Sequence, residues 1–557
     1  MKKNAILIVI GIVVIAVVAG TFSSLRNLVF PLSIERALGN IEWSEDYVTR
    51  RAHLSPSGGA DLAATLPSID TFSMVVNPRQ RSNQLRLEVF SSSEKAGKGD
   101  DGWLVEATTA FNKRNITNAE GKTIQIALRK IASGTGYQFI ASGKHLPHAF
   151  TPSNHLWVRM VEAQGTATTA IRERLVKNTA GVVLKKSTAE ELRQTYPKLD
   201  LQSLTTAVTK GDLVMGYTNP FASSTGLNFL VSVLQSYADS SNLSILDPSV
   251  TSAFEQFQQR VPFVALTTLQ MRDSVERGGS LDSFIMEHQT FVKASALKSG
   301  YEFLPFGILH DNPLYGVGEL TEEEKNGLEV FAKFLDSSQW QRKATDYGFN
   351  ADLGYSGDEI AAGGELLQAQ RIWKEHKDAG RPVAAIFLAD TSGSMDGARI
   401  RALKEALIQG SEFISPNNAI GLVSFSSTVV SRLEIDTFDL DHKARMHAAV
   451  QGFHAGGTTV IYDGIVVAVH QLQQFIQKNP GHKPILIVLS DGEPNGGYNF
   501  TNVEPLLVKA NIPIYTIGYE ADLSELKKLS ALVEAASIDA GQAEVRYKIG
   551  SLLNAQM

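Results

Sequence analysis

Four runs of apolar residues in the last third of the chain do most to limit its fold. They are PVAAIFLAD, AIGLVSFSS, PILIVLSDG and IPIYTIGYE, and each is apolar almost throughout rather than at alternate positions. A strand with this pattern has both faces covered, as in a parallel sheet with helices on either side. Residues 382–553 are therefore predicted to form a doubly wound, Rossmann-like α/β domain.

A second α/β pattern comes earlier, over residues 71–353. QLRLEVF and KTIQIALRK read as strands, WLVEATTAFNKRN has helical spacing, and each strand runs into a turn of small hydroxyl residues. A polar, glycine-bearing stretch at 354–381, which includes the expected helix ELLQAQRIWKEH, is predicted to be a linker. The irregular segment 23–70, with SPSGGADLAA, is predicted to be another linker.

The composition excludes several classes of protein. A chain of 557 residues is too long for one core, and 43% hydrophobic with 20% charged residues is typical of globular domains. The net charge is −6 and no dense basic stretch exists, so a nucleic-acid partner is not expected. The absence of cysteine rules out disulfides, thiolate metal sites and cysteine nucleophiles.

The N-terminus predicts a membrane anchor. Two lysines precede an uncharged, mostly apolar run at residues 5–22, about the length that crosses a bilayer. Lysines remain on the cytoplasmic side, so the chain is expected to be a single-pass protein of the cell membrane with its bulk extracytoplasmic. A cleaved signal peptide, with Val17–Ala19 as a poor cleavage site, is the alternative.

Three loops of the last domain gather oxygen-bearing side chains. Asp390, Ser392 and Ser394 follow the first apolar run, Asp491 follows a later one, and GGTT lies between them. Ligands of doubly wound sheets bind beyond the carboxyl ends of the strands. Carboxylates and hydroxyls without histidine suit Mg²⁺, or Mn²⁺ or Ca²⁺, and leave the ion able to accept an anionic ligand. The alternative is that these residues only cap a helix.

DTSGSM, GGTT and LSDGE together resemble the metal-ion-dependent adhesion site of von Willebrand factor A domains. The resemblance implies that Asp390, Ser392, Ser394 and Asp491 hold the metal, with Thr459 as a further ligand, although Thr458 is an alternative. It also implies a protein partner that offers a carboxylate to the metal. A haloacid-dehalogenase-type phosphatase is disfavoured, because Ser392 stands where its second aspartate is needed.

The middle region is similar to extracellular solute-binding proteins, which hold a ligand between two lobes. FSSSEK, IASGTGY and NPFASSTGL are turns that expose backbone N–H groups at helix starts and can bind an oxyanion. The resemblance implies that Ser92, Ser133 and Ser224 face the cleft. The alternative is that these serines only cap helices, in a domain that keeps a two-lobed shape without binding solute.

These features favour a membrane-anchored binding or adhesion protein. The alternative is a receptor for a small solute in a transport system, with the last domain as its docking module. An enzyme is not expected, since the motifs contain no candidate general base or nucleophile.

Overall fold

Three β-sheets organise the parts of the chain that the computed structural model describes. These are residues 32–54, 63–241, 244–262, 264–265, 268, 271–272, 281–377, 381–492, 494–519, 524–532, 537–540 and 545–557. The predicted anchor at 5–22 lies outside these residues. Within them, no helix is both long enough and apolar enough to cross a bilayer. The α/β class predicted for both regions is confirmed.

The C-terminal domain is built on a seven-stranded sheet with the order β1-β15-β14-β13-β16-β17-β18. Strand β15 is antiparallel to β14, and the remaining pairs are parallel. Apart from β1, the order follows the doubly wound pattern 3-2-1-4-5-6. The strands are β13 (Val383–Asp390), β14 (Ala419–Phe425), β15 (Val429–Thr437), β16 (Lys483–Ser490), β17 (Ile514–Tyr519) and β18 (Ser537–Ala540).

Helices cover both faces of this sheet. Ala385, Phe387 and Ala389 of β13 pack into one apolar core, and Ile386 and Leu388 pack into the other. This is why the strand sequences are apolar at every position. The first core includes α16 (Ala398–Gly410), α17 (Leu440–Gln451) and α21 (Val545–Gln556), and the second includes α18 (Ile461–Lys478), α19 (Phe500–Ala510) and α20 (Ser524–Ala531).

Part of the segment expected to be a linker at 23–70 belongs to this domain. Strand β1 (Trp43–Glu45) pairs with β15 at the edge of the sheet, and α2 (Ile34–Leu38) packs beside α18. Only three residues form β1, too few for a periodic signal, which explains why the sequence reads as irregular. The middle region is thus inserted between the first strand of the sheet and the other six.

The middle region has two lobes, each with its own sheet. Lobe 1 has the strand order β2-β4-β3-β5-β12-β6, and lobe 2 has the order β11-β7-β10-β8-β9. The chain crosses between the lobes after β6 and after β11, and after residue 346 it returns to lobe 2, where Asp358 N donates to Gly307 O at 3.0 Å. The strands of lobe 1 are β2 (Met74–Val76), β3 (Gln84–Ser91), β4 (Thr123–Lys130), β5 (Ala149–Thr151), β6 (Thr168–Arg172) and β12 (Leu314–Val317). Those of lobe 2 are β7 (Asn178–Lys185), β8 (Met215–Thr218), β9 (Val264–Ala265), β10 (Ser283–Glu287) and β11 (Tyr301–His310).

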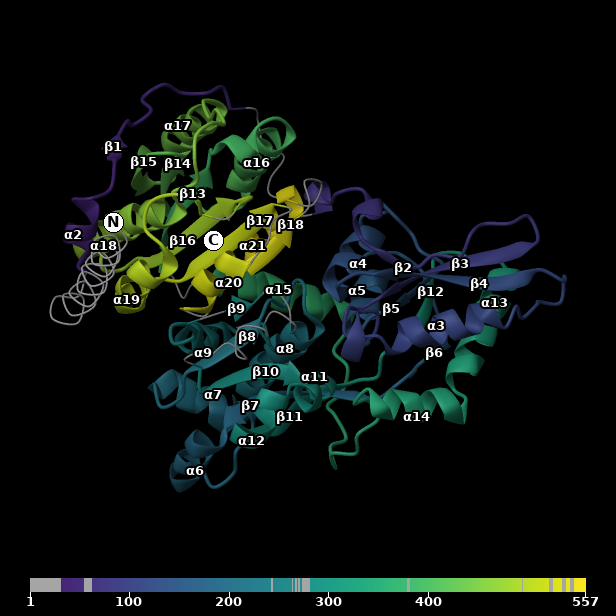
Figure 1. Cartoon of the computed structure of the whole chain (residues 1–557). Helices are drawn as coiled ribbons and strands as arrows, with labels where there is room; N and C mark the ends of the chain where they lie inside the picture. Colours follow the sequence, from purple (N-terminus) through teal and green to yellow (C-terminus); the bar gives the residue numbers. More distant parts are fainter. Residues whose placement is uncertain are drawn as a thin grey trace, which may run out of the picture.

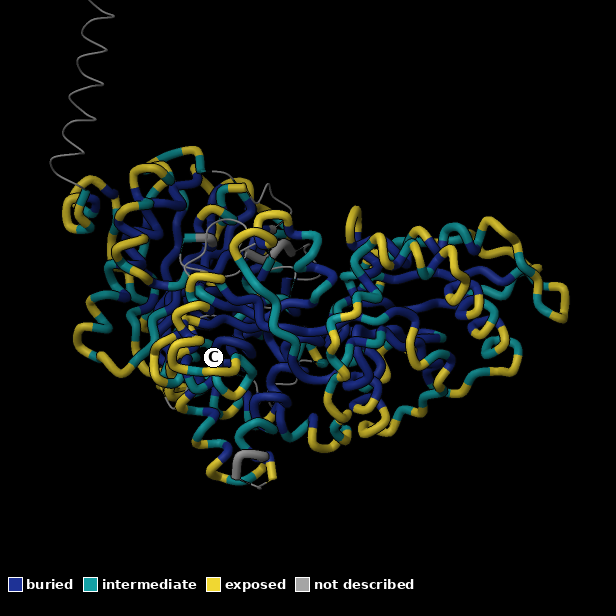
Figure 2. The backbone as a smooth tube through the Cα atoms, turned by 90° about the horizontal axis from the view of Figure 1, so that it is seen from below, coloured by how far each residue is buried: buried dark blue, intermediate teal, exposed yellow. Residues whose placement is uncertain are grey.

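Helices surround both sheets, with buried segments in the interior of the molecule and exposed segments at its periphery (Figure 2). Lobe 1 carries α3 (Trp103–Lys113), α4 (Ser133–Ala141), α5 (Leu156–Ala163), α13 (Glu322–Leu335) and α14 (Ser338–Asp346). Lobe 2 carries α6 (Lys186–Thr195), α7 (Leu201–Lys210), α8 (Ser224–Ser241), α9 (Pro248–Gln258), α11 (His288–Lys293) and α12 (Ser295–Gly300). Short 3-10 helices lie at Ala63–Thr65, Ile69–Thr71, Gly99–Asp101, Gly393–Met395 and Ser411–Phe413.

The stretch expected to be a linker at 354–381 contains a core helix, so that prediction is wrong for α15 (Gly363–His376). This helix packs against α5, α8 and α9 and buries Leu366, Ala369 and Trp373 completely. The Trp373 Nε1 donates a hydrogen bond to the Tyr217 hydroxyl at 2.6 Å. Charged residues on its exposed face gave the sequence its polar character.

Helix α21 connects the C-terminal domain with the two-lobed middle region (Figure 1). It packs tightly on α16, and Leu552 shares one apolar core with lobe 2 residues such as Phe284. On the other side, the Tyr547 hydroxyl lies 2.9 Å from Thr135 Oγ1 and donates to Gln138 Oε1 at 3.0 Å, both in α4. The two regions are therefore packed together through a common helix.

Candidate functional sites

The first site lies at the carboxyl end of the seven-stranded sheet, at its switch point. Strands β13 and β16 run side by side and in parallel, although 92 residues separate the end of the first from the start of the second in the sequence. Asp390 is the last residue of β13, and Asp491 follows β16 directly. Since helices leave these two strands toward opposite faces of the sheet, the strand ends leave room for a ligand between them.

Serine hydroxyls connect the two aspartates. Ser490 Oγ donates to Asp390 Oδ2 at 2.6 Å, and Ser394 Oγ donates to Asp491 Oδ1 at 2.8 Å. The hydroxyls of Ser392 and Ser394 lie 3.0 Å apart. Asp390 is fully buried whereas Ser394 is exposed, so the cluster opens to solvent on the Ser394 side. The structure thus brings together the four residues expected from the first and last loops.

The glycine- and threonine-rich loop joins the cluster through its backbone. Gly393 N donates to Gly457 O at 3.0 Å, which holds this loop against the first one. Thr459 is buried, and its amide donates to Asn495 Oδ1 at 2.7 Å. Thr458 is exposed, and its hydroxyl donates to Ser427 Oγ at 3.2 Å. The two candidate threonines therefore occupy different surroundings.

Burial changes the pKa of one aspartate at this site, and an arginine adds a positive charge beside the other. Burial raises the pKa of Asp390, although hydrogen bonds from Ser392 and Ser490 work against this shift. Arg399, which sequence reasoning missed, donates through Nη1 to Asp491 Oδ2 at 2.8 Å and to Ser394 O at 3.0 Å. No motif marks this arginine, and only its position in the first turn of α16 brings it to the site.

The donor set is compatible with a hard divalent cation. It consists of two carboxylates and several hydroxyls, with no nitrogen or sulfur ligand. Across the described ranges, no group of three or more His, Cys, Asp or Glu side chains is arranged to hold a metal. A cation at this edge would therefore depend on hydroxyl oxygens as well as on Asp390 and Asp491.

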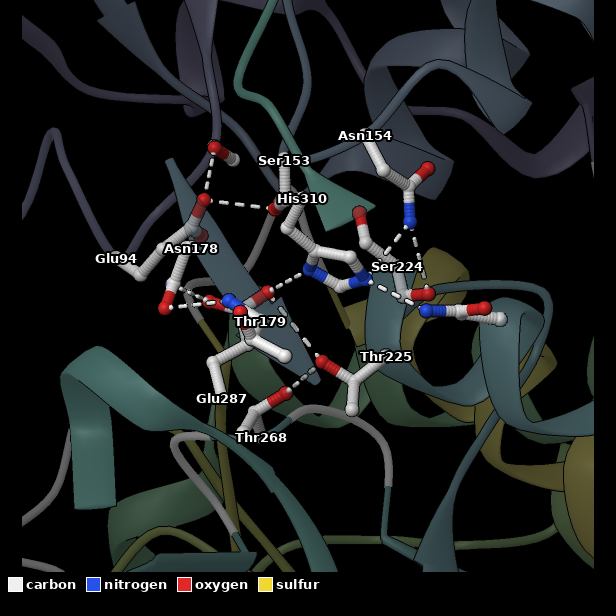
Figure 3. Close-up of polar contacts among 12 residues, drawn as sticks. Glu94, Ser153, Asn154, Asn178, Thr179, Ser224, Thr225, Thr268, Glu287 and His310 are labelled. Atoms are coloured by element: carbon white, nitrogen blue, oxygen red, sulfur yellow. Dashed lines mark hydrogen bonds and ion pairs between the residues drawn. The ribbon is translucent and has the colours of Figure 1, made fainter. Parts of the chain in front are cut away.

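The second site is a small cavity between the two lobes (Figure 3). Its volume is about 40 Å³. The polar residues that line it come from both lobes and are mostly hydroxyls and carboxylates: Ser93, Glu94, Ser133, Ser153, Ser223, Ser224, Thr268 and Glu287. Two of the three serines expected at the cleft, Ser133 and Ser224, are among them.

Ser92, the third expected serine, lies behind the cavity wall. Its hydroxyl donates to Glu94 Oε1 and accepts a hydrogen bond from the Lys95 ammonium. Its neighbour Ser93 lines the cavity instead. The sequence offers three consecutive serines after β3, and the pattern alone does not distinguish between them.

In the sequence, Glu94 is not distinguished from its neighbours in FSSSEK, and Glu287 could lie on the surface as readily as in a cleft. Glu94 Oε1 also accepts from Ser153 Oγ at 2.7 Å. Glu287 is 3% exposed, and its carboxylate contacts His310 Nδ1 at 2.7 Å and accepts from Thr225 and Asn178 at 3.3 and 3.2 Å. The position of Glu287 at the end of β10 was the available signal.

The lobes are in direct contact beside this cavity. Gly134 N in lobe 1 donates to Ala222 O in lobe 2 at 3.2 Å. A Cβ at Gly134 would lie 2.1 Å from the Phe221 carbonyl oxygen, so only glycine fits there. The structure is therefore a closed form of the two-lobed region.

The chain is similar over part of its length to heavy chains of inter-alpha-trypsin inhibitor. Bovine inter-alpha-trypsin inhibitor heavy chain H4 is 30% identical over 157 residues, which is 26% of this chain and 16% of that protein. The human heavy chain H4 is 28% identical over 237 residues, 39% of this chain and 25% of that protein. The chain thus spans about a sixth to a quarter of the length of these relatives.

Comparison with solved structures gives partial matches to proteins of both kinds. A von Willebrand factor type A protein from Catenulispora acidiphila has a TM-score of 0.28 and 17% identity, covering 31% of this chain and 42% of that one. The sulfate-binding protein SubI from Mycobacterium tuberculosis has a TM-score of 0.34 and 13% identity, covering 48% of this chain and 88% of that one.

Family models cover most of both regions. The model of the bacterial extracellular solute-binding protein matches residues 99–350, and the model of the von Willebrand factor type A domain matches residues 386–543. Both matches fall within the ranges expected from the sequence. The chain therefore contains a bacterial extracellular solute-binding domain and a von Willebrand factor type A domain.

Proposed function

We propose that the chain is a binding protein whose type A domain holds a divalent cation, Mg²⁺ before Mn²⁺ or Ca²⁺, and through it an acidic group on a partner protein. Asp390, Ser392, Ser394, Thr459 and Asp491 would hold the ion. The observation that carries this proposal is the meeting of two buried aspartates from adjacent strand ends, linked by serine hydroxyls. When bound, the ion would supply a positive centre that attracts a carboxylate.

The surroundings of each residue support these roles. Asp390 and Asp491 balance the charge of the ion, while the neutral hydroxyls add ligands without adding negative charge. Thr459 is preferred to Thr458 because it is buried, whereas the Thr458 hydroxyl is used by Ser427. The exposed Ser394 side leaves a path for the partner. We propose a binding role rather than catalysis, since no general base adjoins this cluster among the residues that the structure describes.

The cellular placement is part of the same proposal. The apolar run at 5–22 would anchor the chain in the cell membrane, with both domains extracytoplasmic. Fractionation of cells followed by protease treatment of intact spheroplasts tests this arrangement. Degradation of both domains from outside, with the protein in the membrane fraction, is expected. A protein protected from external protease would contradict it.

Metal binding is tested by calorimetry on the full-length chain after treatment with EDTA. We expect one site for Mg²⁺ or Mn²⁺ in the type A domain, lost in Asp390→Ala and in Asp491→Ala. Asp396→Ala is the matched control, because Asp396 is an exposed residue of the same loop. A capture experiment from native envelopes then tests the partner. Retention that is insensitive to EDTA and to Asp390→Ala would contradict the proposal.

A receptor for a small solute is the second candidate function, and the cavity between the lobes favours it. Ser133 and Ser224 line this cavity from opposite lobes, as expected for a ligand held by lobe closure. In this role the type A domain would dock the receptor to other subunits. Helix α21 would connect the two sites, because it contacts both α16 and α4.

A further inference from the structure

Two carboxylates line the cavity between the lobes, and the positive charge of one buried lysine affects both of them. Glu94 comes from lobe 1 and Glu287 from lobe 2, and both line the cavity. The Lys95 ammonium lies 3.6 Å from Glu94 Oε1 and forms an ion pair with it, and its charge also acts on Glu287. The ammonium donates to Ser92 Oγ and to the carbonyls of Thr151 and Pro152, so it lies in the protein behind the cavity wall. No lysine, arginine or histidine is among the described residues that line this cavity.

The geometry around His310 prevents it from supplying a second positive charge. Asn154 Oδ1 accepts from Leu156 N, and Asn228 Oδ1 accepts from Ile308 N, which fixes both amide groups with Nδ2 toward the ring. These Nδ2 atoms lie 3.0 and 3.2 Å from His310 Nε2. Since Nδ2 only donates, Nε2 must accept and carries no proton.

His310 is therefore neutral and donates through Nδ1 to Glu287 Oε1. Among the described residues, the charge of Glu287 has no counterion of its own, and the side chain is only 3% exposed. Burial and the nearby charge of Glu94 raise the pKa of Glu287. This direction is the one expected for a buried carboxylate whose negative charge is not balanced. Buried charges in proteins are normally paired, so this arrangement, as far as the described residues form it, lacks a positive group.

The size of the cavity limits what can fill it. A volume of about 40 Å³ holds only a few water-sized groups, because each needs roughly 10–15 Å³ by this measure. An amino acid or a sugar does not fit the closed form. A metal ion with one or two waters fits, and so does a small ammonium ion.

An oxyanion, which the serine turns favour in the sequence, meets two obstacles. Glu94 from lobe 1 and Glu287 from lobe 2 both repel it. Two amides from the first turns of α4 and α8 are also already used, since Gly134 N donates to Ala222 O and Gly226 N donates to Ser223 Oγ. The hydroxyl oxygens of Ser133, Ser153 and Ser224 are hard donors that suit a cation.

We propose that the cavity between the lobes binds a small cation, either a metal ion or an ammonium ion, held between Glu94 and Glu287. This inference rests on the solute receptor described above as the second candidate function, and it names the chemical class of the solute. The cation gives Glu287 its missing counterion. It also joins a carboxylate of each lobe and so stabilises the closed form.

The experiment uses the full-length chain with Asp390→Ala, which removes the proposed metal site of the type A domain. Calorimetry and thermal unfolding are measured with Ca²⁺, Mg²⁺, Mn²⁺, ammonium and methylammonium chlorides, and with sulfate and phosphate, at constant ionic strength. We expect one of the cations to bind one-to-one and to raise the melting temperature. Which cation does so distinguishes a metal solute from an ammonium solute.

Glu287→Gln in the same background should weaken that binding by at least about tenfold. Glu190→Gln, an exposed residue of lobe 2, should leave the affinity unchanged. Glu94→Gln is the second test and should show the same loss, which covers the case in which Glu287→Gln does not fold. Binding of sulfate or phosphate without any cation, no binding of any probe, or unchanged affinity in these variants overturns the inference. Metal binding in Glu287→Gln with Asp390 intact reports separately on the type A domain.

Discussion

Replacing Trp373 with alanine should destabilise the middle region severely. Trp373 is completely buried, packs on Phe221 with ring centroids 5.7 Å apart, and donates to the Tyr217 hydroxyl. Trp→Ala at a buried site costs about 3–5 kcal/mol of unfolding free energy, and the lost hydrogen bond adds about 1 kcal/mol. A tryptophan on the surface of a linker would cost less than about 0.5 kcal/mol. A core helix and a surface linker at residues 354–381 thus predict losses of unfolding free energy for Trp373→Ala that differ by several kcal/mol.

Urea denaturation of the full-length chain, followed by far-ultraviolet circular dichroism, measures this difference in the transition of the middle region. Arg371→Ala is the matched control, because Arg371 is an exposed residue of the same helix. It should shift the midpoint little. If Trp373→Ala and Arg371→Ala shift the transition equally, then α15 is not part of the core and the packing described above is refuted.

Three further predictions concern other parts of the molecule. Arg399→Gln removes a positive charge beside Asp491 and should tighten Mg²⁺ binding in calorimetry by roughly threefold to tenfold. Replacement of the exposed Arg401 by glutamine should leave the affinity unchanged. Weaker Mg²⁺ binding in Arg399→Gln would contradict this prediction. Gly134→Ala should cost about 1–3 kcal/mol in thermal unfolding through its clash with Phe221, whereas Gly364→Ala, which has open space, should be neutral. Glu88, although burial opposes it, has its pKa lowered to about 2 by His145 and Arg129. This stabilisation is present above about pH 4.5 and is lost as the pH falls toward 2, so Glu88→Gln should flatten acid unfolding in that window.

Residues with a strong local pattern allowed the fold class and the type A domain site to be predicted. The strands β13, β14, β16 and β17 are apolar on both faces, and this property is visible in any single strand. Asp390 was predictable because it ends such a strand, and Asp491 because it follows one directly. Parallel strands in a doubly wound sheet then bring their carboxyl ends to one edge.

Features that depend on distant contacts were not predictable. Strand β1 has only three residues, and its partner β15 lies nearly 400 residues later. The polar face of α15 masked a buried Trp373, because composition averages over both sides of a helix. Glu94 becomes part of a site only when the lobes bring it near Glu287. Ser92 and Ser93 differ only in the direction that the turn gives each side chain.

The pairing of β1 with β15 limits the order in which the parts of the chain can fold during synthesis on the ribosome. The edge strand leaves the ribosome early and has no partner until the chain beyond residue 429 has emerged. The inserted two-lobed body therefore has time to form first, with α15 following it as the next segment. The outer sheet closes late, when its central strands and finally α21 become available. A truncated product that stops within the last third leaves a finished inner body attached to an unfinished outer one.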